Sequence, residues 1–155
     1  MDLPLLVDLL ELWHEKRGNA LLPARSAFSH HDFKRWLGNL CIVQVENHGA
    51  DYVLALIGTH VARYHRDQDF TGQKVGEAPF GLHRDAVRDV LDSAVANRTP
   101  QYETLASEDH PGTSRRLVLP CAEDHETVDR LIVAIYPDKA LLDSLDPEPL
   151  FSLYS

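Results

Sequence analysis

Five short stretches rich in β-branched and other apolar residues, each bounded by turn residues, constrain this chain more than any other feature. The first two, LCIVQVE and YVLALI, are separated only by NHGAD, a connection of hairpin length. The last three are joined by SEDHPGT and AEDHE, which are also turn-rich. Because short connections pair neighbouring strands antiparallel, we expect one antiparallel sheet of five strands. The expected strands are residues 40–46, 52–57, 101–107, 114–120 and 127–137.

Helical patterns lie between the second and third strands, so the expected fold is α+β rather than alternating α/β. Residues 80–97 carry an apolar stripe with charged residues on the opposite side. Thr59 is expected to cap a short helix over HVARYH, and Asp138 another over KALLDSL. A further short helix is expected to begin at Ser29 or His30. The stripe of the 80–97 helix consists of Val87, Val90, Leu91, Ala94 and Val95, and the helix after Ser29 would bury Phe33, Trp36 and Leu37.

The first residues, DLPLLVDLLELWHEKR, predict an amphipathic helix over 2–17. Asp2 is expected to cap it, Pro4 suits its first turn, and Gly18 suits the position just past its end. Its apolar face is too broad to remain in water, so the helix packs either on its own domain or against a second copy of the chain. The residues expected at such a dimer interface are Leu6, Leu9, Leu10 and Trp13.

Composition and charge exclude several classes of function. The 155 residues carry a formal net charge of −9, whereas nucleic-acid binding requires a concentrated basic face. No uncharged run reaches the roughly 20 residues that span a bilayer, and the first residues lack the basic start of a signal peptide. We therefore expect a cytoplasmic protein. Cys41 and Cys121 lie in apolar strands and are expected to be buried reduced thiols, with a disulfide or a metal pair as the alternatives.

The polar residues form no catalytic or metal-binding motif. In the segment LIGTHVARYHRDQDFTG (56–72), an apolar strand ends in a run that holds two His and two Arg residues. His60 and His65 are five positions apart, whereas four positions place two imidazoles on one helix face. The chain also lacks Gly-x-Ser-x-Gly, a phosphate-binding glycine loop and His-Glu-x-x-His. We therefore expect no enzyme activity, no metal and no cofactor.

In the order of its elements and in several short stretches, the sequence resembles PAS domains, and more narrowly a bacterial family of near-single-domain PAS proteins of unknown function. The stretches are LW-x-x-KRGN at 12–19, LPARSAF at 22–28, WLGNLCIVQVE at 36–46, LIGTHVARYHRDQDFTG at 56–72, RRLVLP at 115–120 and VDRLIVAIYP at 128–137. The resemblance implies a five-stranded antiparallel sheet with helices on one face. Where a cavity is present in such domains, it lies between the sheet and those helices.

The resemblance also divides the chain into three parts. Residues 40–137 would form the PAS-like core, residues 1–39 the N-terminal helix and extension, and residues 138–155 a short C-terminal helix and tail. The N-terminal helix of such domains packs across the other face of the sheet or against a second copy. PAS domains usually sense or scaffold, and they are rarely enzymes by themselves.

In a PAS architecture the 56–72 segment lies at the mouth of the cavity. Small-ligand sites are mostly apolar with a few placed polar groups, and Arg63 or Arg115 would pair with an anionic group of the ligand. A haem sensor would need a His ligand on the inner helical segment, where His83 is better placed than His60. The candidates for ligand binding are Ile57, His60, Arg63, Tyr64, Phe70, Phe80, Val87, Arg115, Leu119 and Ile135.

The sequence thus predicts a non-enzymatic sensory or protein-interaction module in signal transduction, which forms a homodimer and acts on an unidentified partner protein. Several versions stay open. In the first, a small ligand binds between sheet and helices and changes the packing of the core against the N-terminal helix. In the second, the same apolar residues fill a closed core, and the protein is a scaffold that regulates its partner by surface contact. A sensor that binds haem or another cofactor is the third.

Overall fold

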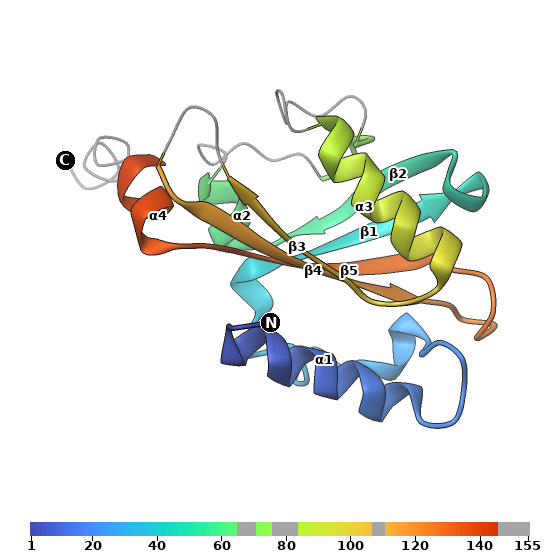
Figure 1. Cartoon of the computed structure of the whole chain (residues 1–155). Coiled ribbons are helices and arrows are strands. Elements are labelled where there is room, and N and C mark those ends of the chain that lie inside the picture. The colour runs from blue at the N-terminus through green and yellow to red at the C-terminus, as the bar shows by residue number, and fades with distance from the viewer. Residues whose placement is uncertain (65–70, 76–83, 107–110, 146–155) are drawn as a thin grey trace.

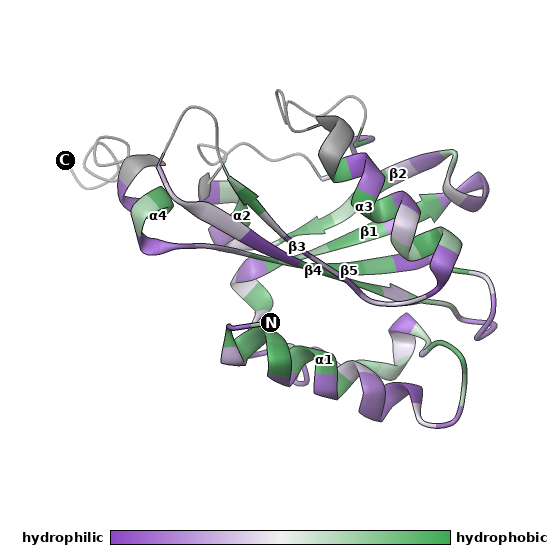
Figure 2. Cartoon of the chain, in the orientation of Figure 1, coloured by the Kyte–Doolittle hydropathy of each residue, from purple (hydrophilic) through white to green (hydrophobic). Residues whose placement is uncertain are grey.

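A single five-stranded antiparallel sheet runs through the computed structural model, which describes residues 1–64, 71–75, 84–106 and 111–145. The strands lie side by side in the order β2-β1-β5-β4-β3, so the central strand β5 pairs with the first strand and the fourth. In Figure 2 the central strands β1 and β5 are mainly hydrophobic, as expected for strands covered on both sides. The strands are β1 (Leu40–Glu46), β2 (Asp51–Ile57), β3 (Gln101–Ala106), β4 (Thr113–Cys121) and β5 (Arg130–Pro137).

The five predicted strands and the α+β fold are confirmed, with strand ends shifted by a few residues. The largest shift is at β5, which was expected from residue 127 and begins at Arg130. The predicted β1–β2 hairpin is closed by a 3₁₀ turn, Asn47–Gly49, in which Asn47 and His48 take positive φ angles. A short polar turn therefore sets the register of the two strands that lead to the 56–72 segment.

One face of the sheet, which we call the inner face, is covered by helix α3 (Arg84–Asn97) (Figure 1). The predicted apolar stripe of this helix is confirmed, because Val90, Leu91 and Ala94 are buried. The Tyr52 hydroxyl of β2 donates a hydrogen bond to the Asp92 carboxylate of α3, which ties the helix to the sheet near the hairpin. The short helix α2 (Thr59–Tyr64) follows β2 directly.

The opposite or outer face is covered by helix α1 (Pro4–Arg17) and the extension that follows it (Figure 1). Leu6 and Leu9 are fully buried, Trp13 is 2% exposed, and Leu10 is half-buried. The indole N–H of Trp13 donates a hydrogen bond to the Pro120 carbonyl of β4 at 2.8 Å. Three of the four side chains predicted for a dimer interface are therefore already covered within the single chain, and helix α1 packs on its own core.

The predicted start and end of α1 need one correction. Pro4 lies in the first turn and Gly18 ends the helix with a φ of 56°, both as expected. Asp2 does not cap the helix, because its two carboxylate oxygens accept hydrogen bonds from Nε and a terminal nitrogen of Arg115, each at 3.0 Å. The guanidinium forms this bidentate pair with a carboxylate that would otherwise be free to bond the first-turn amides. Asp2 thus fixes the start of α1 to strand β4.

Two other helix predictions also differ from the structure. Helix α2 begins at Thr59 itself, and the Gly58 carbonyl accepts the first helical hydrogen bond, so Gly58 rather than Thr59 occupies the cap position. The short helix expected after Ser29 is a series of turns with bonds between residues three apart, followed by a 3₁₀ turn at Leu37–Asn39 (η2). Ser29 and Asp32 bond each other's backbone amides, which closes a local turn instead of starting an α-helix.

The last described element is α4 (Lys139–Leu145), for which the predicted cap is confirmed. The Asp138 carboxylate accepts a hydrogen bond from the Leu141 amide at 2.9 Å and others from the amide and hydroxyl of Thr113. This one side chain therefore starts the helix and binds it to the first residue of β4. No helix within the described residues is long and apolar enough to cross a membrane.

We expect Leu9→Ala to lower the free energy of unfolding by about 2–5 kcal/mol, because it leaves a cavity between α1 and the sheet. Glu11→Ala, on the exposed side of the same helix, should change it by less than about 0.5 kcal/mol. Urea unfolding at several protein concentrations measures both. If the unchanged protein and Leu9→Ala had the same free energy of unfolding at high dilution, Leu9 would serve an intermolecular contact instead.

Candidate functional site

The inner face carries the apolar part of the predicted ligand site. Side chains alternate along a strand and directly paired residues share a face, so Ile57, which pairs with Cys41, lies on the same face as Val43 and Leu54. Ile135 pairs with Arg116 on that face. Val87 lies on the described stripe of α3. All three predicted residues, Ile57, Val87 and Ile135, are partly buried and pack against the core, the two strand residues on the inner face and Val87 on the helix that covers it.

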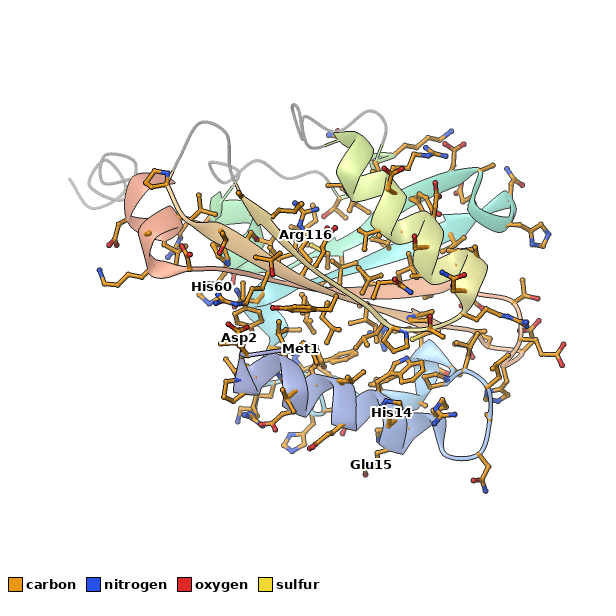
Figure 3. All side chains as sticks on the ribbon, in the orientation of Figure 1. Met1, Asp2, His14, Glu15, His60 and Arg116 are labelled. Carbon is orange, nitrogen blue, oxygen red and sulfur yellow. The ribbon has the colours of Figure 1, made fainter. Side chains whose placement is uncertain are left out.

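Two predicted ligand residues lie on the opposite face, which corrects their assignment. Arg115 pairs with Asp2 at the start of α1. Leu119 is four residues further along β4 and therefore lies on the same side of the strand, where it is fully buried. The sequence alone could not fix the register, and a shift of one residue in a strand reverses every side chain. Figure 3 shows the result: Arg116 lies on the α3 side of the sheet, and Asp2 lies on the α1 side.

Of the remaining predicted ligand residues, three lie on helix α2 and two lie outside the described residues. His60 and Arg63 are exposed on α2. Tyr64 is the last residue of that helix. Phe70, Phe80 and the alternative haem ligand His83 lie outside the described residues.

The polar residues at the end of β2 form a structural contact around two glycines. A Cβ atom on Gly58 would collide with the backbone carbonyl of Gly38, and one on Gly38 would collide with the imidazole of His60. The Gly58 amide also donates a hydrogen bond to the Leu40 carbonyl at 2.7 Å. The Gly-Thr-His sequence therefore allows α2 to lie directly against the η2 turn, and the exposed His60 ring rests on Gly38.

Besides the Tyr52–Asp92 hydrogen bond, the inner face carries the ion pair of Arg116 and Glu103, which sequence reasoning missed. A terminal nitrogen of Arg116 lies 3.5 Å from Oε1 of Glu103, and their side chains are 13% and 23% exposed. Burial lowers the pKa of Arg116 and raises the pKa of Glu103. Among the residues that the structure describes, Nε of Arg116 and Oε1 of Glu103 are buried atoms without a hydrogen-bond partner, although Oε1 is the atom that faces the guanidinium in the ion pair. Each such atom costs about 1–3 kcal/mol when it is left without a partner.

One sequence signal pointed to this pair. Two adjacent arginines in an apolar strand that is covered on both faces must point in opposite directions, so one of them had to lie on the inner face. Glu103 follows from the pairing of β3 with β4, where it is the direct partner of Arg116. The identity of the inward arginine was decided by the register alone.

The two cysteines are free and buried, which confirms the prediction of reduced thiols. Cys41 lies on the inner face near Arg116, whereas Cys121 is on the outer face, two residues beyond Leu119. Burial raises the pKa of each thiol to about 12. Within the described residues, no three His, Cys, Asp or Glu side chains are grouped so that they could hold a metal ion.

The geometry defines a class of protein in which one curled antiparallel sheet carries a helix-covered inner face with a few polar groups. The family model for the PAS domain matches residues 1–136, and the chain belongs to this family. Among solved structures it is similar to a sensory box sensor histidine kinase from Vibrio cholerae, with 15% identity and a TM-score of 0.51 over 86% of this chain and 92% of that one. At that identity the similarity shows the fold alone. No curated protein matches the sequence.

We expect Gly58→Ala to lower the free energy of unfolding by about 1–3 kcal/mol, because the new methyl group meets the Gly38 backbone carbonyl, which cannot move aside cheaply. Gly38→Ala should cost less, since the exposed His60 ring can turn away. Thr59→Ala, at the exposed neighbouring position, is the control. Equal losses for Gly58→Ala and Thr59→Ala in urea unfolding would contradict the close contact.

Neither thiol should react with a disulfide reagent at pH 8 in the folded protein, because a raised pKa leaves almost no thiolate and burial blocks access. Both thiols should react within seconds in 6 M guanidinium chloride, because this denaturant unfolds the chain and leaves the two side chains roughly fully exposed. Absorbance of the released thiol measures the rates. Fast modification of either cysteine in native buffer would show that solvent reaches the face of the sheet on which that cysteine lies.

Proposed function

We propose that this PAS-domain protein is a non-enzymatic sensory module of signal transduction that recognises a small polar ligand on its inner face. The observation that carries the proposal is the half-buried Arg116–Glu103 pair, in which one buried donor atom and one buried acceptor atom lack hydrogen bonds to the described residues. A ligand that bears both an acceptor and a donor would satisfy the two atoms at once. Ile57, Val87 and Ile135 supply the apolar surface that most ligand sites combine with such groups.

Family membership and fold support the sensory role, since PAS domains generally act as sensory modules. A ligand shifts a conformational equilibrium only if it binds the two states with different affinity. In our proposal the ligand alters how Arg116 sits on the inner side of β4. The next residue, Arg115, holds Asp2 at the start of α1 on the other side. A change at one arginine would therefore reach the N-terminal helix through one strand.

We also propose that the protein forms a homodimer, acts on a partner protein and is located in the cytoplasm. Because Leu6, Leu9 and Trp13 are buried in the single chain, we place the dimer contacts on exposed residues of the outer face instead. The scaffold version would also use the outer surface. It differs from the sensor version in requiring no molecule at Arg116.

A screen of small metabolites by thermal denaturation and native mass spectrometry tests the sensor version. A ligand at one hundred times its Kd should stabilise the protein by about 2.7 kcal/mol, which raises the Tm by several degrees. We expect the double variant Glu103→Gln/Arg116→Met to lose this shift. The two changes together avoid leaving one buried charge without its partner.

The adjacent arginine provides the matched control. Arg115→Met removes the same side chain from the same strand on the outer face, so it should keep the ligand-induced shift. A ligand whose binding survived in Glu103→Gln/Arg116→Met would overturn the inner-face site. No bound mass and no thermal shift across the panel would favour the scaffold version over the sensor.

A further inference from the structure

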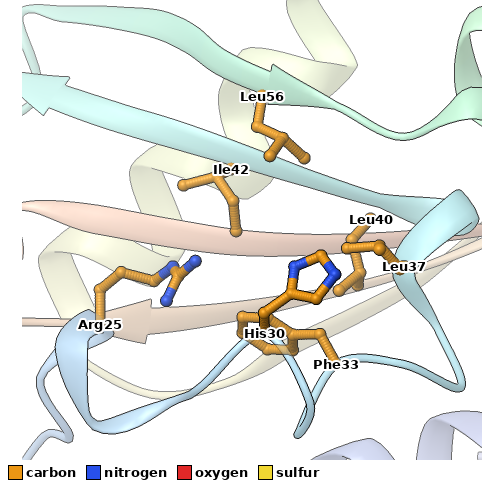
Figure 4. Close-up of a pocket in the computed structure, with 7 residues that line it drawn as sticks. All are labelled: Arg25, His30, Phe33, Leu37, Leu40, Ile42 and Leu56. Carbon is orange, nitrogen blue, oxygen red and sulfur yellow. The ribbon is translucent and has the colours of Figure 1, made fainter.

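A second recessed site lies on the outer face, away from the Arg116–Glu103 pair. It is a pocket of about 80 Å³ between the N-terminal extension and strands β1 and β2 (Figure 4). Leu40 and Ile42 form its floor and are 1% and 7% exposed. These residues alternate along β1 with Cys41 and Val43, which point to the inner face. The pocket is therefore separate from the ligand site proposed above, and its role is independent of that proposal.

The extension holds the pocket open with a set of local contacts. The rings of Phe28 and Phe33 are stacked with centroids 5.2 Å apart. The guanidinium of Arg25 lies 4.8 Å from the centre of the Phe33 ring and donates a hydrogen bond to the Phe28 carbonyl at 3.1 Å. Arg25 is thus fixed at the rim before any partner arrives, which reduces the entropy cost of binding. Figure 4 shows Arg25 and His30 on the extension, across from Ile42 and Leu56 of the strands.

The size of the pocket limits what it can hold. Whole small molecules occupy pockets of roughly 300–1,000 Å³, far more than the 80 Å³ found here. The pocket is thus roughly a quarter of the smallest such site or less. It suits one aliphatic side chain of a larger partner better than a whole small molecule. Leu56, at the rim, is 39% exposed and extends the apolar surface around it.

The charge of the rim limits the occupant further. Arg25 is half-buried and His30 is exposed, and both stand at the mouth of an apolar pocket. The chain as a whole has a formal net charge of −9, so the guanidinium of Arg25 beside an apolar pocket is a local exception on an acidic protein. A carboxylate beside the apolar side chain would complement Arg25 in the bidentate geometry that guanidinium groups favour.

We propose that this outer-face pocket docks a segment of a partner protein in which a branched aliphatic side chain lies next to acidic residues. The aliphatic side chain fills the space over Leu40 and Ile42, and a neighbouring carboxylate pairs with Arg25. Side chains that fill a desolvated pocket near the centre of an interface contribute most of its binding energy. The pocket gives the module a recognition surface for its output that does not compete with the inner face.

Model peptides test this chemistry directly. The probe is acetyl-Asp-Glu-Leu-Asp-Glu-amide, titrated into the full ¹⁵N-labelled chain and followed by amide chemical shifts. We expect shifts confined to the 25–42 segment and the end of β2. The same peptide with Ala in place of Leu should bind about fiftyfold more weakly, because it loses roughly three buried carbons. Acetyl-Lys-Lys-Leu-Lys-Lys-amide should not bind, because its charges oppose Arg25.

Two substitutions at the rim separate the contributions. Arg25→Gln should weaken binding of the Leu peptide about two- to fivefold, and the loss should be larger at low salt than at high salt. Leu56→Ala should weaken it without changing the salt dependence, and because Leu56 is exposed the protein should fold normally. Glu103→Gln/Arg116→Met, on the inner face, should leave peptide binding unchanged.

Several results would overturn the proposal. They are equal binding of the Leu and Ala peptides, no shifts at millimolar peptide, or shifts that map to the inner face. Binding that appeared only after removal of residues 146–155, DPEPLFSLYS, would assign the pocket to the chain's own acidic and apolar end instead of a partner. Loss of peptide binding together with an intact metabolite response would leave the inner-face sensor standing, since the two sites lie on opposite faces.

Discussion

Burial of one antiparallel sheet on both faces is the constraint on which the rest of the structure depends. Strands β1, β5 and β4 lie in the middle of the sheet, where α3 covers one side and α1 the other. In a sheet buried in this way, every residue must be compatible with one of two interiors. A polar residue in the buried part of these strands therefore needs a specific partner on one of the two faces. Arg115 and Arg116 are the clearest example, because one binds the N-terminal segment and the other is buried beneath α3.

This arrangement gives the two faces different chemical characters. The inner face combines half-buried aliphatic side chains with one ion pair that is short of hydrogen bonds. The outer face is closed for most of its length by α1. The indole N–H of Trp13 bonds the Pro120 carbonyl of the sheet, and that of Trp36, on the extension, bonds the Leu5 carbonyl of α1. Where the extension leaves the sheet near Leu56, a small pocket with a cationic rim remains. In our two proposals, a ligand and a partner protein would bind on opposite sides of one layer of strands.

Much of the fold could be predicted because it follows from local patterns. Runs of β-branched residues, short polar turns and the stripe of residues 87–95 each constrain their own segment. The wrong predictions concern local features, namely the residues that start two helices. Asp2 and Thr59 are good caps in isolation, but a guanidinium from β4 took the Asp2 carboxylate, and a close approach to Gly38 placed Gly58 at the start of α2. Long-range contacts of this type leave no trace in a window of neighbouring residues.

The amino-acid sequence by itself determined the number of strands, their antiparallel pairing, the position of the main helix and the burial of both cysteines, because these depend on periodicity and hydrophobicity along the chain. Only the tertiary structure decided which face each strand residue occupies. Register is set by pairing between segments far apart in sequence, and one step of register exchanges the two faces. For that reason the sequence named Arg115 and Leu119 as ligand residues, while the folded sheet placed Arg116 and Glu103 on the inner face.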